Sequence, residues 1–206
     1  MHAKSPSPLR SNFPSELIAL QDAELRYVPD FYQRSESQVL VENFLTHVPW
    51  LQETINFGGK QVLVPRLQAW YGDDATHYSY SGLRLTPLPW TSALSDIKVK
   101  IEHCFNLRFN SVLLNYYRNG QDSVAWHSDK EAALGPDPLI ASLSLGMERK
   151  FELKRRDGVA QKISLDLADG SLLIMGRGLQ QHWSHQIPKQ PWITQPRINL
   201  TFRLIH

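Results

Sequence analysis

His127 and Asp129 are separated by one residue, a spacing that allows both side chains to bind one metal ion. In an extended segment, side chains two positions apart project from the same face. A second, distant histidine would complete a set of two imidazoles and one carboxylate, which leaves open positions on the metal, as non-haem Fe(II) oxygenases require. His182 and His185 are both candidates. A His-x-Asp pair also arises by chance in a chain with eight histidines, and zinc is a competing metal.

Residues 197–204 alternate between polar and apolar side chains, as a β-strand with two different faces does. The polar face carries Arg197, Asn199, Thr201 and Arg203. On an edge strand such a face would be solvated. Alternatively, each of the two arginines could hold one carboxylate group by a bidentate fork, so that a dicarboxylate ligand would suit the pair.

Asn115 and Tyr117 also share one face of a predicted strand, together with Leu113. Polar groups on an otherwise apolar strand need hydrogen-bond partners. The pair therefore predicts either a buried Asn–Tyr hydrogen bond or a site that orients a bound carboxylate or keto group.

Two amphipathic helices precede most of these residues. Ser35-Glu36-Ser37-Gln38 has the spacing of a capping box and predicts the start of the first helix, which Pro49 ends. A second helix is predicted after Pro89-Trp90, where apolar residues recur at intervals of three and four. Cys104 lies on its apolar face and is expected to fill the core rather than to react.

Short strand-like runs dominate the chain after residue 110, at 110–117, 139–145, 150–155, 161–167, 171–175 and 197–205. Turn dipeptides such as Asn119-Gly120 and Asp157-Gly158 separate them. We therefore predict a mainly β fold with supporting helices (α+β), in which N-terminal helices pack on one side of a double-stranded β-helix, or jelly roll. Residues 1–20 are expected to form a partly irregular arm and residues 21–206 a single domain, with the jelly-roll core at 108–206.

The composition excludes several classes of protein. The 206 residues have a hydrophobic content of 42% and a net charge of +2, which excludes a disordered chain. One cysteine excludes a disulfide framework and a zinc finger. No apolar run approaches the ~18 residues needed to cross a bilayer, and the N-terminus lacks the pattern of a signal peptide. We expect no membrane contact and a cytoplasmic location, with access to the nucleoid in a bacterium, or a nuclear one in a eukaryote.

In this order, Asn-x-Tyr, His-x-Asp, His and Arg-x-Asn-x-Thr-x-Arg resemble the AlkB family of Fe(II)- and 2-oxoglutarate-dependent dioxygenases. The resemblance extends from about Phe57 to Leu204 and is nearest to the branch that repairs duplex DNA. It is carried by residues 64–73, 78–83, 141–146, 170–175 and 182–188, and by the spacing of 12 residues from His185 to Arg197 and six more to Arg203.

The resemblance implies a role for each matching residue. His127, Asp129 and His185 would bind Fe(II), whereas His182 matches a histidine that is not a ligand in the family. The 2-oxoglutarate pocket would be formed by Asn115, Tyr117, Arg197, Asn199, Thr201 and Arg203. The segment at about 50–90 would recognise the substrate.

The resemblance also implies oxidative demethylation of N-alkylated DNA bases such as 1-methyladenine and 3-methylcytosine. The reaction would consume O2 and 2-oxoglutarate and release formaldehyde, succinate and CO2. Tyr80 matches the aromatic that stacks on the flipped base, Tyr78 is nearby, and Glu131 matches an acid that approaches the base. Phe57, beside two glycines, is expected on a loop as a hydrophobic wedge that enters the duplex. Tyr80 could equally pack across strands, and Glu131 could be a surface charge.

Arg149-Lys150 and Lys154-Arg155-Arg156 place five cations within eight residues. Such a run is often a solvated face, but beside a DNA pocket it predicts phosphate contacts. The partner we expect is alkylated DNA, single- or double-stranded, with RNA as an alternative, and we expect a monomer.

Three other interpretations remain open from the sequence. One is the same chemistry on RNA or on a protein side chain. Another is a nucleic-acid-binding jelly roll without turnover. The last is a zinc hydrolase with the same metal ligands, which would leave the two arginines unexplained.

Overall fold

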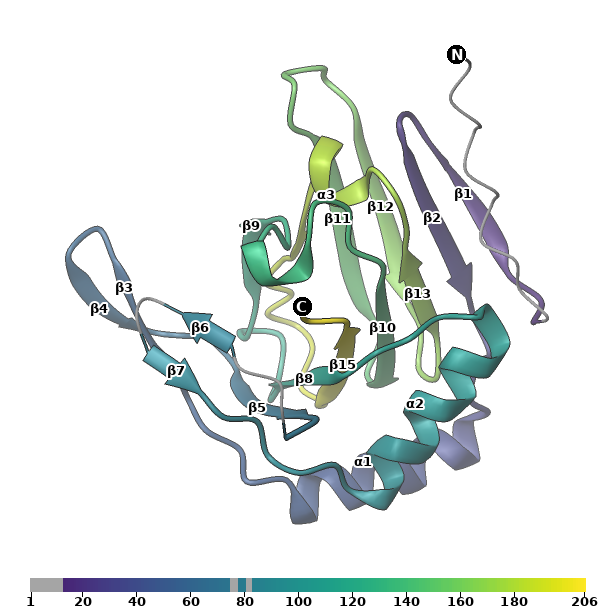
Figure 1. Cartoon of the computed structure of the whole chain (residues 1–206), viewed down its shortest axis with the longest axis vertical. Helices are drawn as coiled ribbons and strands as arrows, with labels where there is room; N and C mark the ends of the chain where they lie inside the picture. Colours follow the sequence, from purple (N-terminus) through teal and green to yellow (C-terminus); the bar gives the residue numbers. More distant parts are fainter. Residues whose placement is uncertain (1–12, 75–77, 81–82) are drawn as a thin grey trace.

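Two antiparallel β-sheets face one another and form a jelly roll, as predicted (Figure 1). The computed structural model describes residues 13–74, 78–80 and 83–206; of residues 55, 57, 78–80 and 83–85 it describes the backbone alone. The strand order is β1-β2-β13-β10-β15-β8-β5 in the larger sheet and β12-β11-β14-β9 in the smaller one. Each sheet takes four of the eight strands from β8 to β15, and the chain changes sheet between consecutive strands except at the β11–β12 hairpin, in the manner of a double-stranded β-helix.

The larger sheet contains seven strands drawn from both ends of the chain. They are β1 (Glu16–Leu20), β2 (Ala23–Val28), β5 (Leu67–Gly72), β8 (Ser111–Tyr117), β10 (Ile140–Gly146), β13 (Leu172–Met175) and β15 (Arg197–Arg203). Within residues 1–20, which were expected to form a partly irregular arm, residues 16–20 are a regular strand, because they pair with β2 in register from Glu16↔Tyr27 to Leu20↔Ala23.

The smaller sheet contains β9 (Val124–His127), β11 (Arg149–Arg155), β12 (Lys162–Leu167) and β14 (Trp183–Ile187). Strands β9 and β14 escaped prediction because each is short and lacks polar–apolar alternation: β9 begins with three apolar residues, and the three middle residues of β14 are polar. The 3₁₀ helix η1 (Ala132–Leu134) follows β9, and the one-turn helix α3 (Leu179–His182) precedes β14.

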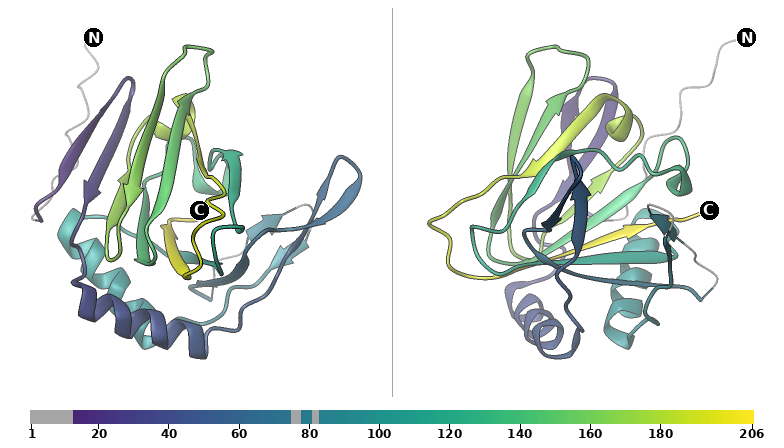
Figure 2. Two further views of the ribbon diagram at one scale, coloured as in Figure 1. Left: turned by 180° about the vertical axis from the view of Figure 1, so that it is seen from behind. Right: turned by 90° about the vertical axis from the view of Figure 1, so that its left-hand side faces the viewer.

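Helices α1 (Arg34–His47) and α2 (Ser92–Phe105) pack on the outer face of the larger sheet (Figure 2). Phe44 of α1 and Leu94, Ile97 and Ile101 of α2 are fully buried against it, as the apolar periodicity predicted. The capping box was predicted two residues too late, because the N-cap is Gln33 rather than Ser35 and the backbone N–H of Gln33 donates to Glu36 Oε2 at 2.9 Å. None of the described helices is long and apolar enough to span a bilayer.

Strand β15 separates two cores. Its apolar residues Ile198, Leu200 and Phe202 face the helices and have no exposed surface. Its polar residues face the space between the sheets, and Arg197, Asn199 and Thr201 are all at least 93% buried. The alternative of a solvated edge strand is wrong, because β15 pairs with β8 on one side and β10 on the other. The polar face therefore lines an interior.

Two hairpins project beyond the sheets, β3 (Thr54–Phe57) with β4 (Lys60–Leu63) and β6 (Tyr78–Tyr80) with β7 (Leu83–Leu85) (Figure 1). Gly58 and Gly59 form the two-residue turn of the first, with φ of 59° and 79°. Two successive positive φ angles match the twist of a tight hairpin, which favours glycine at both positions. The prediction that Phe57 lies on a loop is therefore wrong, because Phe57 is the last residue of strand β3.

Candidate metal centre

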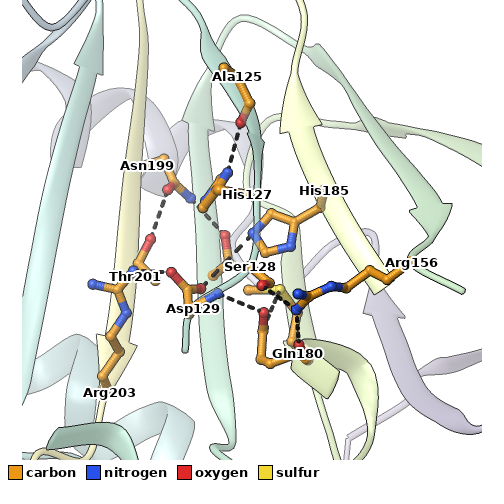
Figure 3. A network of polar contacts seen from close by, with 12 residues as sticks. Ala125, His127, Ser128, Asp129, Arg156, Gln180, His185, Asn199, Thr201 and Arg203 are labelled. Carbon is orange, nitrogen blue, oxygen red and sulfur yellow. Dashed lines mark hydrogen bonds and ion pairs between the residues drawn. The ribbon is translucent and has the colours of Figure 1, made fainter. Parts of the chain in front are cut away.

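His127, Asp129 and His185 come together between the two sheets, with one ligand atom of each residue within 4.8 Å of the others. Strand pairing explains the approach of the histidines, because His185 of β14 lies directly opposite His127 of β9. Their ring centroids are 4.3 Å apart. Asp129 follows two residues after β9, and its Oδ2 lies 3.9 Å from His185 Nε2 (Figure 3).

The choice between the two candidate histidines follows from the position of each in its element. His185 is in the middle of β14, faces inward and is 4% exposed. His182 ends α3 and is outside the cluster. Spacing alone could not make this choice, because the two histidines are only three residues apart and β14 was not predicted from the sequence.

Hydrogen bonds orient the outer parts of this cluster. His127 Nδ1 lies 2.9 Å from the carbonyl of Ala125, so that a proton on Nδ1 leaves Nε2 free to bind metal. Asp129 Oδ1 accepts a hydrogen bond from Arg203 Nη2 at 2.9 Å, and the Asp129 backbone N–H donates to Gln180 Oε1 at 2.9 Å. Gln180 is 1% exposed and was missed in the sequence, because nothing in its spacing relates it to Asp129.

The protonation states suit metal binding. Burial is the largest influence on His185 and, with the nearby His127, lowers its pKa to about 3, so the imidazole is neutral. For Asp129, burial alone would raise the pKa, but Arg203, His185 and His127 together bring it below its usual value. The cluster thus offers one carboxylate and a neutral imidazole, the forms in which both groups bind metals.

The metal cluster opens into a cavity that is also lined by residues of four adjacent strands of the larger sheet, β13, β10, β15 and β8. The register places Tyr117 beside Arg197 and Asn115 beside Asn199. All the residues predicted to bind 2-oxoglutarate line this cavity together with the metal cluster, namely Asn115, Tyr117, Arg197, Asn199, Thr201 and Arg203. Arg66, Ser142 and Phe151 line it as well.

Several polar groups of the cavity are already bound to one another. Asn199 Nδ2 donates to Ser142 Oγ at 2.8 Å, and Thr201 Oγ1 donates to Asn199 Oδ1 at 3.0 Å. Asn115 Oδ1 accepts from Arg66 Nε at 2.7 Å. The predicted Asn115–Tyr117 hydrogen bond is replaced by this contact with Arg66, a residue that sequence reasoning had not placed in the site.

The two arginines of β15 retain donors for a ligand. Arg197 donates through Nη2 to Ser144 Oγ at 2.9 Å, whereas its buried Nε and Nη1 have no partner in the part of the chain that the structure describes. Arg203 Nε is likewise buried without a partner there. Unsatisfied buried donors are rare and costly, so their presence indicates a bound acceptor.

The donor set and the charges fit Fe(II) and 2-oxoglutarate. Two imidazoles and one carboxylate form the facial set typical of non-haem Fe(II) oxygenases. Three arginines and a single carboxylate line the cavity, which favours an anionic ligand beside the metal. A keto-diacid would satisfy the free donors of Arg197 with one carboxylate.

For most of the residues predicted to bind the base, the structure describes the backbone but not the side chain. Tyr78 and Tyr80 lie on β6 and Phe57 ends β3, but the side chains of all three are outside the description. Glu131 precedes η1, and its Oε2 is buried without a partner among the described residues. Glu131 is therefore not the simple surface charge of the alternative interpretation.

The basic run on β11 is only partly available to phosphates. Arg149 and Arg155 face inward, are 1% and 9% exposed and bind protein groups. Lys150 forms an ion pair with Asp166 at 2.9 Å. Lys154 and Arg156 are exposed, and Arg156 Nη1 donates to Ser128 Oγ, between the two ligands of the His-x-Asp pair. The prediction that all five cations contact phosphates is wrong for the two inward-facing arginines, because strand alternation buries them.

Comparison with known proteins agrees with this geometry. Residues 24–203 match the family model of the 2OG-Fe(II) oxygenase superfamily. Human alpha-ketoglutarate-dependent dioxygenase alkB homolog 3 is 38% identical over 187 residues, covering 86% of this chain and 65% of that protein. The chain thus spans just under two thirds of the length of this relative.

Two further similarities extend the comparison. The DNA oxidative demethylase ALKBH2 of Arabidopsis thaliana is 36% identical over 228 residues, covering 97% of this chain and 72% of that protein. The structure of OsALKBH1 aligns with a TM-score of 0.66 at 18% identity, over 92% of this chain and all of the other, which supports the fold. The chain belongs to the 2OG-Fe(II) oxygenase superfamily and, within it, to the AlkB group.

Proposed function

We propose that this protein is an Fe(II)- and 2-oxoglutarate-dependent dioxygenase that removes N-alkyl groups from bases of nucleic acid. One observation carries the proposal: the His127–Asp129–His185 cluster shares a cavity with Arg197 and Arg203 of β15, each of which has a buried guanidinium nitrogen that no described residue binds. A zinc hydrolase would use the metal cluster but would have no need of the two arginines. A nucleic-acid-binding module without turnover would need neither the cluster nor the arginines.

In the net reaction, one oxygen atom of O2 enters 2-oxoglutarate, which loses CO2 and becomes succinate. The other enters a C–H bond of the N-methyl group. The resulting N-hydroxymethyl group breaks its N–C bond and leaves as formaldehyde, while the base regains a nitrogen lone pair or proton. Iron, when bound, supplies the oxidising chemistry that no protein side chain offers.

The protein's own residues contribute binding and orientation. His127, Asp129 and His185 would hold the metal, with Gln180 and Arg203 fixing the loop and carboxylate of Asp129. Arg197 would bind the distal carboxylate of the keto-diacid. The buried walls of the jelly roll exclude water from the reacting groups.

The substrates we propose are 1-methyladenine and 3-methylcytosine. Each carries a methyl group on its pairing edge and a positive charge, and a lesion that has lost its pairing is flipped most easily. The unpartnered buried Oε2 of Glu131, two residues from Asp129, would attract such a cation. The name of the ALKBH2 relatives, DNA oxidative demethylase, supports DNA as the polymer. We also propose that the protein acts as a monomer. Its location would give it access to DNA, in the cytoplasm of a bacterium or the nucleus of a eukaryote.

The test is formaldehyde release from methylated oligonucleotides with Fe(II), 2-oxoglutarate and O2. Wild type should release formaldehyde, and Asp129→Ala should lose at least about 100-fold in rate because the metal loses a ligand. His182→Ala is the matched control and should keep its rate. Parallel assays with methylated RNA and methylated peptide distinguish the alternative substrates. Turnover without 2-oxoglutarate, or none on any polymer, would contradict the proposal.

A further inference from the structure

Arg149 is a buried cation that the reaction outlined above does not use. It begins β11 in the smaller sheet, and its side chain is turned toward the larger one with 1% of the residue exposed. A guanidinium keeps its charge even when buried, so its surroundings must compensate for the lost water.

All the hydrogen-bond acceptors that surround Arg149 are uncharged. Its Nη2 donates to the carbonyls of Asp122 and Pro188 at 2.9 and 2.8 Å, and its Nη1 to the carbonyl of Asn119 at 3.2 Å. Its Nε donates to Gln190 Oε1 at 3.2 Å. Arg149 therefore joins the loop after β8 to the loop after β14, but no carboxylate neutralises it through these contacts.

The Asp122 side chain is not available to neutralise Arg149. Both of its carboxylate oxygens accept hydrogen bonds from the Arg118 guanidinium at 2.8 Å, and Oδ2 also accepts the Arg118 backbone N–H. The carboxylate attracts Arg149 from a distance, yet its hydrogen-bonding capacity is largely taken.

Tyr117 connects Arg149 to the cavity. The Arg149 guanidinium carbon lies 5.5 Å from the centroid of the Tyr117 ring, and that of Arg197 lies 5.0 Å from the same centroid. Burial first, and then repulsion from Arg197, lowers the pKa of Arg149 to about 10. Both guanidinium groups thus contact the same aromatic ring, at the end of the cavity where Arg197 Nε and Nη1 have no partner among the described residues.

We propose that Arg149 is a positioning residue that makes this end of the cavity selective for a dicarboxylate. Its contact with the Tyr117 ring holds that ring beside Arg197, and its guanidinium adds a second positive charge near that of Arg197. The charge is compensated when the distal carboxylate of 2-oxoglutarate binds Arg197. The inference rests on the proposed function, because it concerns the cosubstrate of that same site.

A purely structural role for Arg149 makes a different prediction. If it only joined two loops, its loss would weaken the binding of any keto acid equally. If its charge selects the diacid, its loss should weaken 2-oxoglutarate far more than pyruvate, which has the same keto acid group but no distal carboxylate.

The experiment measures the Kd of each keto acid by calorimetry with Fe(II)-loaded protein in the absence of O2. For Arg149→Met we expect the Kd of 2-oxoglutarate to rise about tenfold and the Kd of pyruvate to change less than about twofold. Arg149→Lys, which keeps the charge, should stay within about threefold of wild type. Arg155→Met is the matched control, since Arg155 is the other inward-facing arginine of β11 but contacts the ring of Trp183 rather than that of Tyr117, and both Kd values should be unchanged.

The outcomes separate the inference from the proposed function. If wild type fails to bind 2-oxoglutarate, the proposed function is wrong. If wild type binds it and Arg149→Met shifts both Kd values equally, or Arg149→Lys loses as much as Arg149→Met, the inference is overturned. Should Arg149→Met fail to fold, Arg149→Gln removes the charge while keeping an amide donor, and the same ratio of Kd values decides.

Discussion

His185 and His182 are only three residues apart, yet only His185 belongs to the metal cluster found among the described residues. His185→Ala should weaken Mn(II) or Fe(II) binding more than about 100-fold, because a ligand contributes more than the outer groups whose loss costs 10–100-fold. His182→Ala should leave the affinity within about twofold, since His182 is outside the cluster. Isothermal titration calorimetry with the metal ion measures the affinity of each variant. Equal losses in the two variants would contradict the assignment.

At this scale the sequence predicted which side chains share a face but not what that face contacts. Alternation placed Arg197 and Arg203 together, and the strand keeps them so. It could not reveal that the face is interior, because burial depends on the strands at either side. Gln180 and Arg66 were beyond reach for the same reason: each meets its partner across more than 45 residues of chain.

At the scale of elements, β11 shows how one strand divides a run of like charges. Lys154 and the exposed Arg156 just after the strand remain available to nucleic acid, whereas Arg149 and Arg155 do not. The double variant Lys154→Ala/Arg156→Ala should reduce the slope of log K against log salt by about 2 for duplex DNA.

A matched control for this salt slope removes the same charge elsewhere. Lys98 and the exposed Arg108 belong to α2 and the turn after it, against the outer face of the larger sheet. Lys98→Ala/Arg108→Ala should leave the slope unchanged. Binding of a methylated duplex at several salt concentrations, read by fluorescence anisotropy, makes the comparison, and equal slopes for the two double variants would refute the phosphate contacts.

The end of β11 also predicts a pH effect. Arg155 binds Asp157 and Asp22, and the hydrogen bonds from Arg155 are the main reason why the pKa of Asp157 falls to about 2. Because the ionised carboxylate is favoured in the folded protein, its contribution to stability is present above pH 4 and is lost as the pH falls from about 4 to 2. Asp157→Asn should therefore lower Tm near pH 6 and match wild type near pH 2. A difference in Tm that is constant over this range would contradict the ion pair.

The helices and six of the eight core strands were predictable from periodicity, because each has an apolar face of regular spacing, whereas β9 and β14 were not. The hairpin that carries Phe57 was taken for a loop, since four-residue strands with polar neighbours give little alternation. The pairing of β1 with β2 is equally invisible, as it depends on the existing edge of the larger sheet.

At the scale of the whole molecule, the cavity couples ligand binding to folding. The metal ligands come from the smaller sheet and the segment after it, and the arginines come from the larger sheet. A ligand that contacts both sheets binds the folded state alone, and at 100 times its Kd it should add about 2.7 kcal/mol to the free energy of unfolding. Here Fe(II) and 2-oxoglutarate together would join the two layers.

The position of β9 gives this coupling a local consequence. Four residues long and at the margin of the smaller sheet, β9 is joined to it only through β14. Coordination of His127 and His185 to one ion would link β9 to β14 through the metal and stabilise this edge of the sheet. Removing the ion with a chelator should accelerate amide hydrogen exchange in residues 124–127 and leave β10 unaffected. The loss of iron would then first destabilise the region around the metal site, so that β9 opens locally before any global unfolding.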